Sequence, residues 1–230
     1  MKRLYIVSES DNDAAFYAMC ADLVTGNRYE VDAIKSRKRR GYQAVQALLD
    51  GNLRRARGEA NAGSDVSFLV GIDNDRSPSE ENMGMDRSKL NEEERNRPSR
   101  LAWMSAIFED VLGANRDAWP LPVAMAVPVE MIESWLVRAL RNSELQPARY
   151  FSRADSLRAR EFYHPLAPPP QWKDLAEEAQ ANVQIPNKPE FYLHVMTSCG
   201  PLESLAERSL SFRMFKEQLD AWPKPVAAQP

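Results

Sequence analysis

The sequence predicts an α/β fold, with a mainly parallel central sheet flanked by helices and a helical extension at the C-terminus. Two short apolar runs without alternation, residues 4–7 and 66–72, are typical of strands covered on both faces. Segments whose apolar residues recur at helical spacing separate such runs. Strands that alternate with helices favour parallel neighbours, because parallel strands need long crossover connections.

The composition is that of a globular protein of 230 residues, with 43% hydrophobic and 27% charged residues. A net charge of −3 argues against a globally basic nucleic-acid coat protein, although a local basic patch could still bind a polyanion. Cys20 and Cys199 have no spacing typical of a disulfide framework or a zinc site. The N-terminal apolar run is too short for a signal core or a membrane helix, so we expect a cytoplasmic protein without membrane contact.

The first half of the chain predicts three strands, at residues 4–7, 29–34 and 66–72. The first strand ends at turn and capping residues, and a helix follows until Gly26. Its apolar residues at helical spacing are Phe16, Met19, Cys20 and Leu23. The second predicted helix carries one apolar face, formed by Tyr42, Val45, Leu49 and Leu53.

The second half begins with residues 76–98, which are polar and predict a long surface loop. A helix is expected at residues 99–112, with core-facing side chains Met104, Ile107, Phe108 and Val111. Residues 122–127 predict a fourth strand, and Pro128 opens a helix. The apolar stripe of that helix comprises Val129, Ile132, Leu136 and Leu140.

Helical patterns also occur at residues 172–181, 189–197 and 201–219, and the tail from residue 222 is expected to fray. We therefore divide the chain into an α/β domain, residues 1–145, and a helical extension packed on it, residues 146–230.

Acidic side chains follow the first and third predicted strands. Glu9 follows the first, and Asp73 and Asp75 follow the third. Ligands of parallel sheets bind outside the carboxyl ends of the strands, so we expect these residues at the same edge. Mg²⁺ prefers carboxylate, water and phosphate oxygens, and clustered carboxylates repel one another without a cation. The sequence predicts Asp73 and Asp75 as Mg²⁺ ligands, with Glu9 as ligand or proton shuttle, Mn²⁺ as a substitute ion and Glu133 as a fourth acid.

Each of these acids also has a structural interpretation. Asp73 and Asp75 could simply form a turn after a strand, because turns favour Asp. Glu9 and Glu133 could be structural, Glu133 as a first-turn carboxylate that complements the helix dipole. Asp11 and Asp13 are interpreted as the cap and first-turn acids of the first helix.

Three segments resemble motifs of the TOPRIM family. Residues 6–16 resemble its first motif, with Glu9 after a strand and Phe16 in the following helix; the Gly that follows the motif's Glu is Ser10 in this chain. Residues 68–75 resemble the second motif, an apolar strand ending in Asp-x-Asp. Residues 128–136 resemble a Pro, Glu and Trp-Leu stretch of small bacterial TOPRIM-like proteins related to the overcoming-lysogenization-defect nucleases.

The resemblance covers roughly the first 140 residues, about one domain. It implies a TOPRIM or Rossmann-like fold and a Mg²⁺-dependent nuclease, or related phosphoryl-transfer enzyme, with a role in anti-phage defence. The replacement of the motif's Gly by Ser10 bears on whether the protein is active more than on its fold. The alternative is a catalytically silent TOPRIM-like module that binds a partner protein or nucleic acid and regulates a larger complex.

Basic residues cluster between the second strand and the second helix. A DNA or RNA backbone would be attracted to this run, which comprises Lys35, Arg37, Lys38, Arg39 and Arg40. The alternative is a solvated surface. A second group, Arg54, Arg55 and Arg57, either extends the patch or forms the outer face of its helix. Lys188 resembles a Pro-Lys element that could meet a phosphate. The interpretation also allows a partner such as an ATPase from the same operon, and a homo-oligomer.

Overall fold

The computed structural model describes residues 2–35, 41–73, 100–128, 132–140, 172–198, 200 and 202–225. The chain divides into two compact units. The sheet unit comprises Met1–Ile72, Ala102–Ala126 and Met214–Pro230, and the helical unit comprises Asp73–Leu101 and Val127–Arg213. The boundary predicted between residues 145 and 146 lies outside the described residues and stays a prediction.

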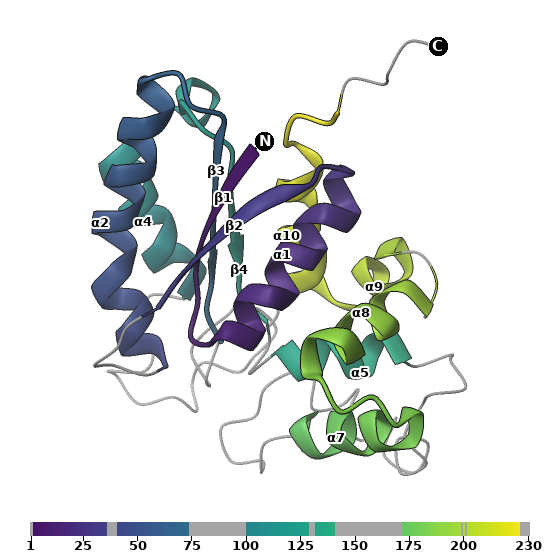
Figure 1. Cartoon of the computed structure of the whole chain (residues 1–230). Helices are drawn as coiled ribbons and strands as arrows, with labels where there is room; N and C mark the ends of the chain where they lie inside the picture. Colours follow the sequence, from purple (N-terminus) through teal and green to yellow (C-terminus); the bar gives the residue numbers. More distant parts are fainter. Residues whose placement is uncertain are drawn as a thin grey trace, which may run out of the picture. The chain divides into compact units, whose positions relative to one another are not determined.

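The sheet unit contains a four-stranded sheet whose strands all run parallel, in the order β2-β1-β3-β4 (Figure 1). The strands are β1 (Lys2–Val7), β2 (Tyr29–Ile34), β3 (Val66–Gly71) and β4 (Val123–Ala126). Every residue of β3 and the last four residues of β1 are buried, as their apolar runs predict. The predicted α/β fold with a parallel sheet flanked by helices is thereby confirmed.

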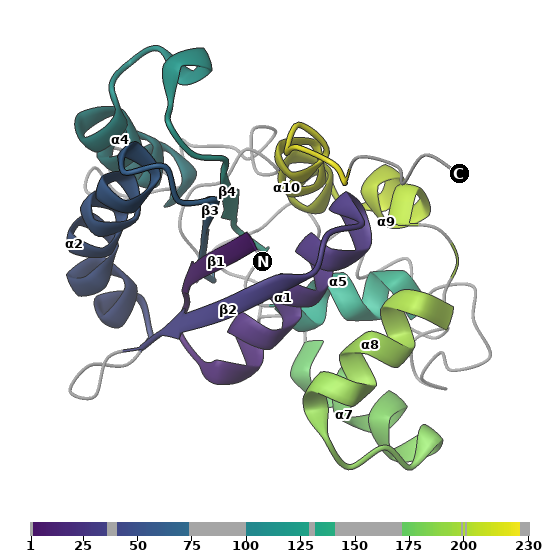
Figure 2. The same ribbon diagram turned by 45° about the horizontal axis from the view of Figure 1, so that its top comes forward.

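Helices cover both faces of this sheet. Figure 2 shows α2 (Tyr42–Asn61) and α4 (Arg100–Leu112) on one face. The opposite face carries α1 (Asp11–Thr25) and the part of α10 (Leu210–Asp220) that begins at Met214. A short 3₁₀ turn, η3 (Arg116–Ala118), precedes β4. None of the helices in the described ranges has the length and apolar character needed to cross a membrane.

Burial confirms the predicted stripe of α2 at Val45, Leu49 and Leu53, which are fully buried. On α1 it confirms Phe16 and Cys20, whereas Leu23 is 41% exposed. Tyr17, which the predicted stripe of α1 omits, is only 1% exposed. The ring of Tyr17 lies against the backbone of Gly71, where an added Cβ would overlap the ring atoms Cε2 and Cζ. Tyr17 therefore belongs to the buried side of α1.

The helical unit contains α5 (Ile132–Ala139), α7 (Trp172–Val183), α8 (Lys188–Ser198) and α9 (Leu202–Arg208), and α5 contacts the other three. Trp135 on α5 is fully buried, and its indole N–H donates to the Ser211 hydroxyl at 2.8 Å. The helix predicted over residues 201–219 is divided into α9 and α10. Ser209 causes this break, because its hydroxyl accepts from the Phe212 amide at 3.3 Å and caps the start of α10.

The chain after α10 remains part of the sheet unit. Trp222 is 4% exposed, and its ring contacts Tyr29 edge to face at 6.1 Å between centroids. Asn27 donates to the Pro223 carbonyl at 2.8 Å. This packing differs from the fraying expected from residue 222 onward, because an apolar ring and a carbonyl of the tail both find partners on the sheet unit.

Candidate functional site

The turn after β1 places Glu9 and starts α1. Ser8 is buried and donates to the Ser10 carbonyl at 2.9 Å. The Ser10 hydroxyl accepts from the Asp13 amide at 3.2 Å, so Ser10 is the N-cap of α1. The cap expected at Asp11 is therefore wrong by one residue. Asp11 and Asp13 both lie in the first turn, where their charges complement the helix dipole.

Ser10, at the position where the TOPRIM motif that residues 6–16 resemble has Gly, has no backbone strain. Its φ of −144° and ψ of 166° are extended values that any residue adopts. The hydroxyl adds a capping hydrogen bond that Gly could not form. The departure from the motif is thus compatible with the observed turn.

The Glu9 carboxylate lies beside the start of α2. Gly41, the residue before that helix, has a φ of 58° and a ψ of −151°, a conformation that side chains disfavour. A Cβ at Gly41 would lie 3.4 Å from Glu9 Oε2. The positive end of a helix dipole favours a carboxylate. The sequence predicts that a helix starts here, but it does not predict that Glu9 lies close to that start.

Asp73 follows the end of β3 by two residues. The intervening Ile72 still belongs to the sheet, since its amide donates to the Ala126 carbonyl at 3.0 Å. Because β1 and β3 are adjacent parallel strands with Val7 opposite Val70, their carboxyl ends reach the same edge of the sheet. Glu9 follows one of these ends and Asp73 the other.

The complete set of predicted metal ligands is only partly described. Asp75 lies outside the described residues. Within residues that the structure does describe, no group of three His, Cys, Asp or Glu side chains is placed to hold a metal ion. The Mg²⁺ site formed by Glu9, Asp73 and Asp75 therefore stays a prediction.

Two further candidates lie close together in the helical unit. Glu133 is in the first turn of α5, and Lys188 is the first residue of α8. Lys188 Nζ lies 3.8 Å from Glu133 Oε1, and the two side chains are 34% and 15% exposed. This ion pair supplies Glu133 with a positive counter-charge. The sequence does not predict the pair, because the two residues are 55 positions apart.

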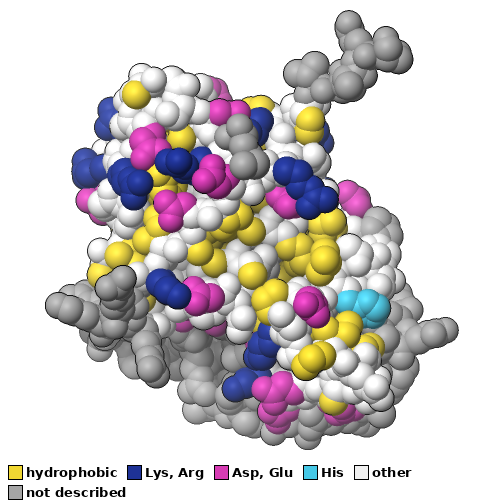
Figure 3. Space-filling view, viewed as in Figure 1, with side chains coloured by type: hydrophobic (Ala, Val, Ile, Leu, Met, Phe, Trp, Pro, Cys, Tyr) yellow, Lys and Arg dark blue, Asp and Glu magenta, His cyan; other side chains and the backbone are white. Residues whose placement is uncertain are grey.

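The basic run is described at one residue only. Lys35 forms an ion pair with Asp11 at 2.7 Å, with both side chains more than 60% exposed. Such surface pairs contribute little stability. Arg37, Lys38, Arg39 and Arg40 lie outside the described residues. Among the described side chains coloured in Figure 3, Lys and Arg lie close to Asp and Glu.

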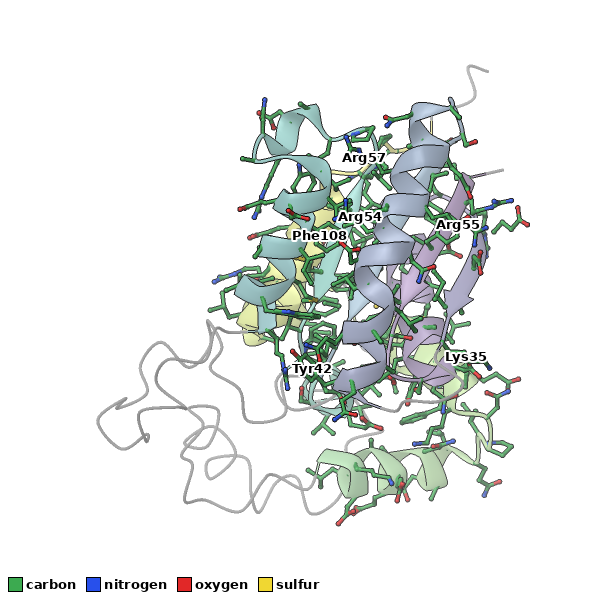
Figure 4. The ribbon with its side chains drawn as sticks, turned by 90° about the vertical axis from the view of Figure 1, so that its left-hand side faces the viewer. Lys35, Tyr42, Arg54, Arg55, Arg57 and Phe108 are labelled. Atoms are coloured by element: carbon green, nitrogen blue, oxygen red, sulfur yellow. The ribbon has the colours of Figure 1, made fainter. Side chains whose placement is uncertain are left out.

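The three arginines of α2 are engaged within the sheet unit (Figure 4). Arg54 contacts carboxylates on α2 and α4, Asp50 and Asp110, both at 2.9 Å. Arg57 donates to the Val111 carbonyl at 2.6 Å. Arg55 binds a carboxylate of its own helix and lies over the ring of a β1 tyrosine. These contacts join α2 to its neighbours and favour the structural interpretation of these arginines.

A charged cluster connects β1 to α2. The Tyr5 hydroxyl lies 2.8 and 3.0 Å from the two Glu59 oxygens, and Arg3 and Arg55 also contact this carboxylate. The hydrogen bond from Tyr5, with the charges of Arg55 and Arg3, holds the pKa of Glu59 below its usual value against the opposing effect of desolvation. Burial raises the pKa of Tyr5. The cluster connects the strand to the helix and contains none of the predicted metal ligands.

Comparisons of this chain with protein-family models, with curated proteins and with solved structures gave no match. The resemblance to TOPRIM proteins accordingly depends on the motifs at residues 6–16, 68–75 and 128–136.

Proposed function

We propose that the protein is a Mg²⁺-dependent nuclease of the TOPRIM type that hydrolyses phosphodiester bonds in DNA or RNA. The observation that carries this proposal is the parallel pairing of β1 with β3. This pairing brings the chain out of the sheet at the same edge just before Glu9 and just before Asp73. Ligands of α/β sheets bind outside this edge.

The chemistry of the donors fits a hard divalent cation. Glu9, Asp73 and Asp75 offer carboxylate oxygens, which Mg²⁺ and Mn²⁺ both accept. When bound, such an ion would neutralise charge on the phosphate and lower the pKa of a coordinated water. In this proposal Asp73 and Asp75 hold the ion, and Glu9 completes the ligand set or accepts a proton from the attacking water.

The remaining candidates are assigned to binding. Lys35 and the four basic residues at 37–40 would contact the nucleic-acid backbone through charge. In the helical unit, Glu133 holds Lys188 at 3.8 Å and would fix the position of its ammonium group against a phosphate. Glu133 would thus act through Lys188 as a positioning residue.

The direct test is cleavage of single-stranded and duplex DNA and of RNA by the purified protein, with Mg²⁺, with Mn²⁺ and with a chelator. Asp73→Asn should abolish cleavage while the protein remains folded. Asp65→Asn is the matched control. Asp65 is an exposed aspartate directly before β3, whereas Asp73 follows the other end of that strand. Equal cleavage by the Asp73→Asn variant and the unaltered protein would remove the assigned site.

The second candidate function is a catalytically silent TOPRIM-like module that binds nucleic acid or a partner protein, such as an ATPase from the same operon. The ion pair between Lys188 and Glu133 favours it, because Glu133 already has a cationic partner. Calorimetric titration with Mg²⁺ separates the two functions. The nuclease should bind the ion through Asp73 and lose this binding in Asp73→Asn, whereas a silent module should show no Asp73-dependent binding.

A further inference from the structure

The edge of β4 that faces away from β3 carries backbone groups that point away from the sheet. Among the described strands, β4 pairs with β3 alone. The carbonyls of Pro122 and Ala126 accept from amides of the neighbouring strand segment, at 2.9 and 3.0 Å. Because successive residues of a strand turn their polar groups to opposite sides, those of Val123 and Met125 are directed outward.

Side chains of the segment that follows Met214 form hydrogen bonds with these outward-directed groups. Gln218 Oε1 accepts from the Met125 amide at 3.0 Å, and Gln218 Nε2 donates to the Met125 carbonyl at 3.2 Å. The Trp222 indole N–H donates to the Val123 carbonyl at 3.0 Å. The amide of Gln218 therefore makes the same two hydrogen bonds that the backbone of an added strand would make with Met125.

Gln218 is held firmly in this position. Its Nε2 also donates to the Met214 carbonyl one turn earlier in α10, at 2.9 Å. Trp222 is 4% exposed and contacts Tyr29 with its ring, which fixes the indole N–H against Val123. Both groups belong to the sheet unit, and both are carried by the segment that follows Met214.

The sequence of β4 offers nothing that would resist pairing with another strand. Val123–Ala126 contains only small or apolar residues, and neither charge nor proline interrupts it. The opposite edge strand differs, because β2 carries Glu30 and Asp32, and these acids oppose self-pairing through like-charge repulsion. One edge of the sheet is thus protected by its own charges, while the other depends on side chains from elsewhere.

We propose that Gln218 and Trp222 form a surrogate strand that prevents β4 from pairing with β4 of a second copy of this chain. Two β4 strands placed edge to edge would bring only uncharged side chains together, so a second copy is the partner that fits. A groove of about 500 Å³ beside this edge is lined in part by Val123, Met125, Gln218 and Trp222.

The test removes the amide and measures self-association by sedimentation velocity over a range of protein concentrations. Gln218→Met keeps the length of the side chain without its hydrogen bonds, and Gln218→Ala removes both. Each variant should self-associate at a concentration at least about tenfold lower than the unaltered protein does. Infrared spectra of the associated species should gain the band of intermolecular strand pairing.

Gln180→Ala is the matched control. The Gln180 amide also binds backbone carbonyls, those of Ile185 and Pro186 at 2.7 and 3.1 Å, but it belongs to the helical unit, which contains none of the described strands. This variant should keep the association of the unaltered protein. Gln218→Glu should associate less than Gln218→Met, because its carboxylate still accepts from Met125 and adds a charge to the edge. A folded Gln218→Met that associates no more than the unaltered protein would overturn the proposal; should Gln218→Ala fail to fold, Gln218→Met decides.

Discussion

Lys188 Nζ lies 3.8 Å from Glu133 Oε1, so the first residue of α8 is paired with the first turn of α5. Glu133 is the less exposed member of the pair, at 15% of its side chain. A partly buried carboxylate that loses its partner keeps the cost of desolvation. Charge therefore contributes to the contact between these two helices, in addition to apolar packing.

The pair can be measured with a double-mutant cycle of Glu133→Gln and Lys188→Met, using urea unfolding. We expect a coupling of about 1 kcal/mol, because the pair is partly screened from water. The exposed pair of Lys173 and Glu177 on α7, at 3.9 Å, is the control and should couple by only about 0.3 kcal/mol. Equal coupling in the two cycles would show that burial does not strengthen the Glu133 pair.

Gly71→Ala should destabilise the protein by about 1–3 kcal/mol, because the new methyl group would overlap the Tyr17 ring in a packed core. Thermal and urea unfolding measure this loss. Gly51→Ala is the control, since Gly51 lies within α2 and an added Cβ would meet nothing within 4 Å. That variant should gain up to about 1 kcal/mol from helix propensity. A second change, Tyr17→Leu, should relieve part of the Gly71→Ala loss.

Gly41→Ala should also lower the free energy of unfolding, by about 1–2 kcal/mol, because its positive φ disfavours a side chain. Gly63→Ala, at a φ of 89° with open space around it, isolates this conformational cost. The Gly41→Ala loss should be nearly unchanged when Glu9 is replaced by Ala, because the added Cβ would lie at the ordinary contact distance of 3.4 Å from Glu9 Oε2. A loss that largely disappears with Glu9→Ala would contradict a conformational origin.

The stability contribution of Glu59 should depend on pH in the acid range. Its folded-state pKa lies below the usual value, so the contribution is complete above that usual value and disappears as pH falls through the folded-state pKa. The difference in unfolding free energy between the unaltered protein and Glu59→Gln should therefore be largest near neutrality and shrink toward about pH 3. Denaturant titrations at several pH values measure this difference, and a difference that stays constant from neutral to acid pH would contradict the prediction.

Charge removal from the basic run tests nucleic-acid binding separately from cleavage. Replacing Arg37, Lys38, Arg39 and Arg40 together by Gln should make the dependence of log affinity on log salt shallower by about 2–4. The control replaces three exposed cations elsewhere, Arg28, Lys173 and Lys224. Fluorescence anisotropy with labelled DNA and RNA measures both. Identical salt slopes for the two variants would show that the basic run is solvated surface that does not bind nucleic acid.

Much of the sheet could be predicted from residue patterns alone. The run at 66–72 corresponds to β3, because burial on both faces requires a continuous apolar run. The run at 29–34 corresponds to β2, whose side chains are exposed or half-buried and which was found from its partial alternation. The two acids Glu9 and Asp73 could be located after strands for the same reason. The strand ends that precede these acids reach one edge because the strands are parallel, and the alternation of strands and helices predicts this topology.

Contacts between distant side chains could not be predicted in this way. The sequence alone determined the α/β class, the four strands and the positions of Glu9 and Asp73 along them, because polarity patterns and turn residues act over a few neighbouring positions. Only the tertiary structure decided that Tyr17 faces Gly71, that Arg54 binds Asp110 and that Gln218 closes the edge of β4. Such partners are separated by dozens of residues, and packing of the folded chain selects them without leaving a periodic signal.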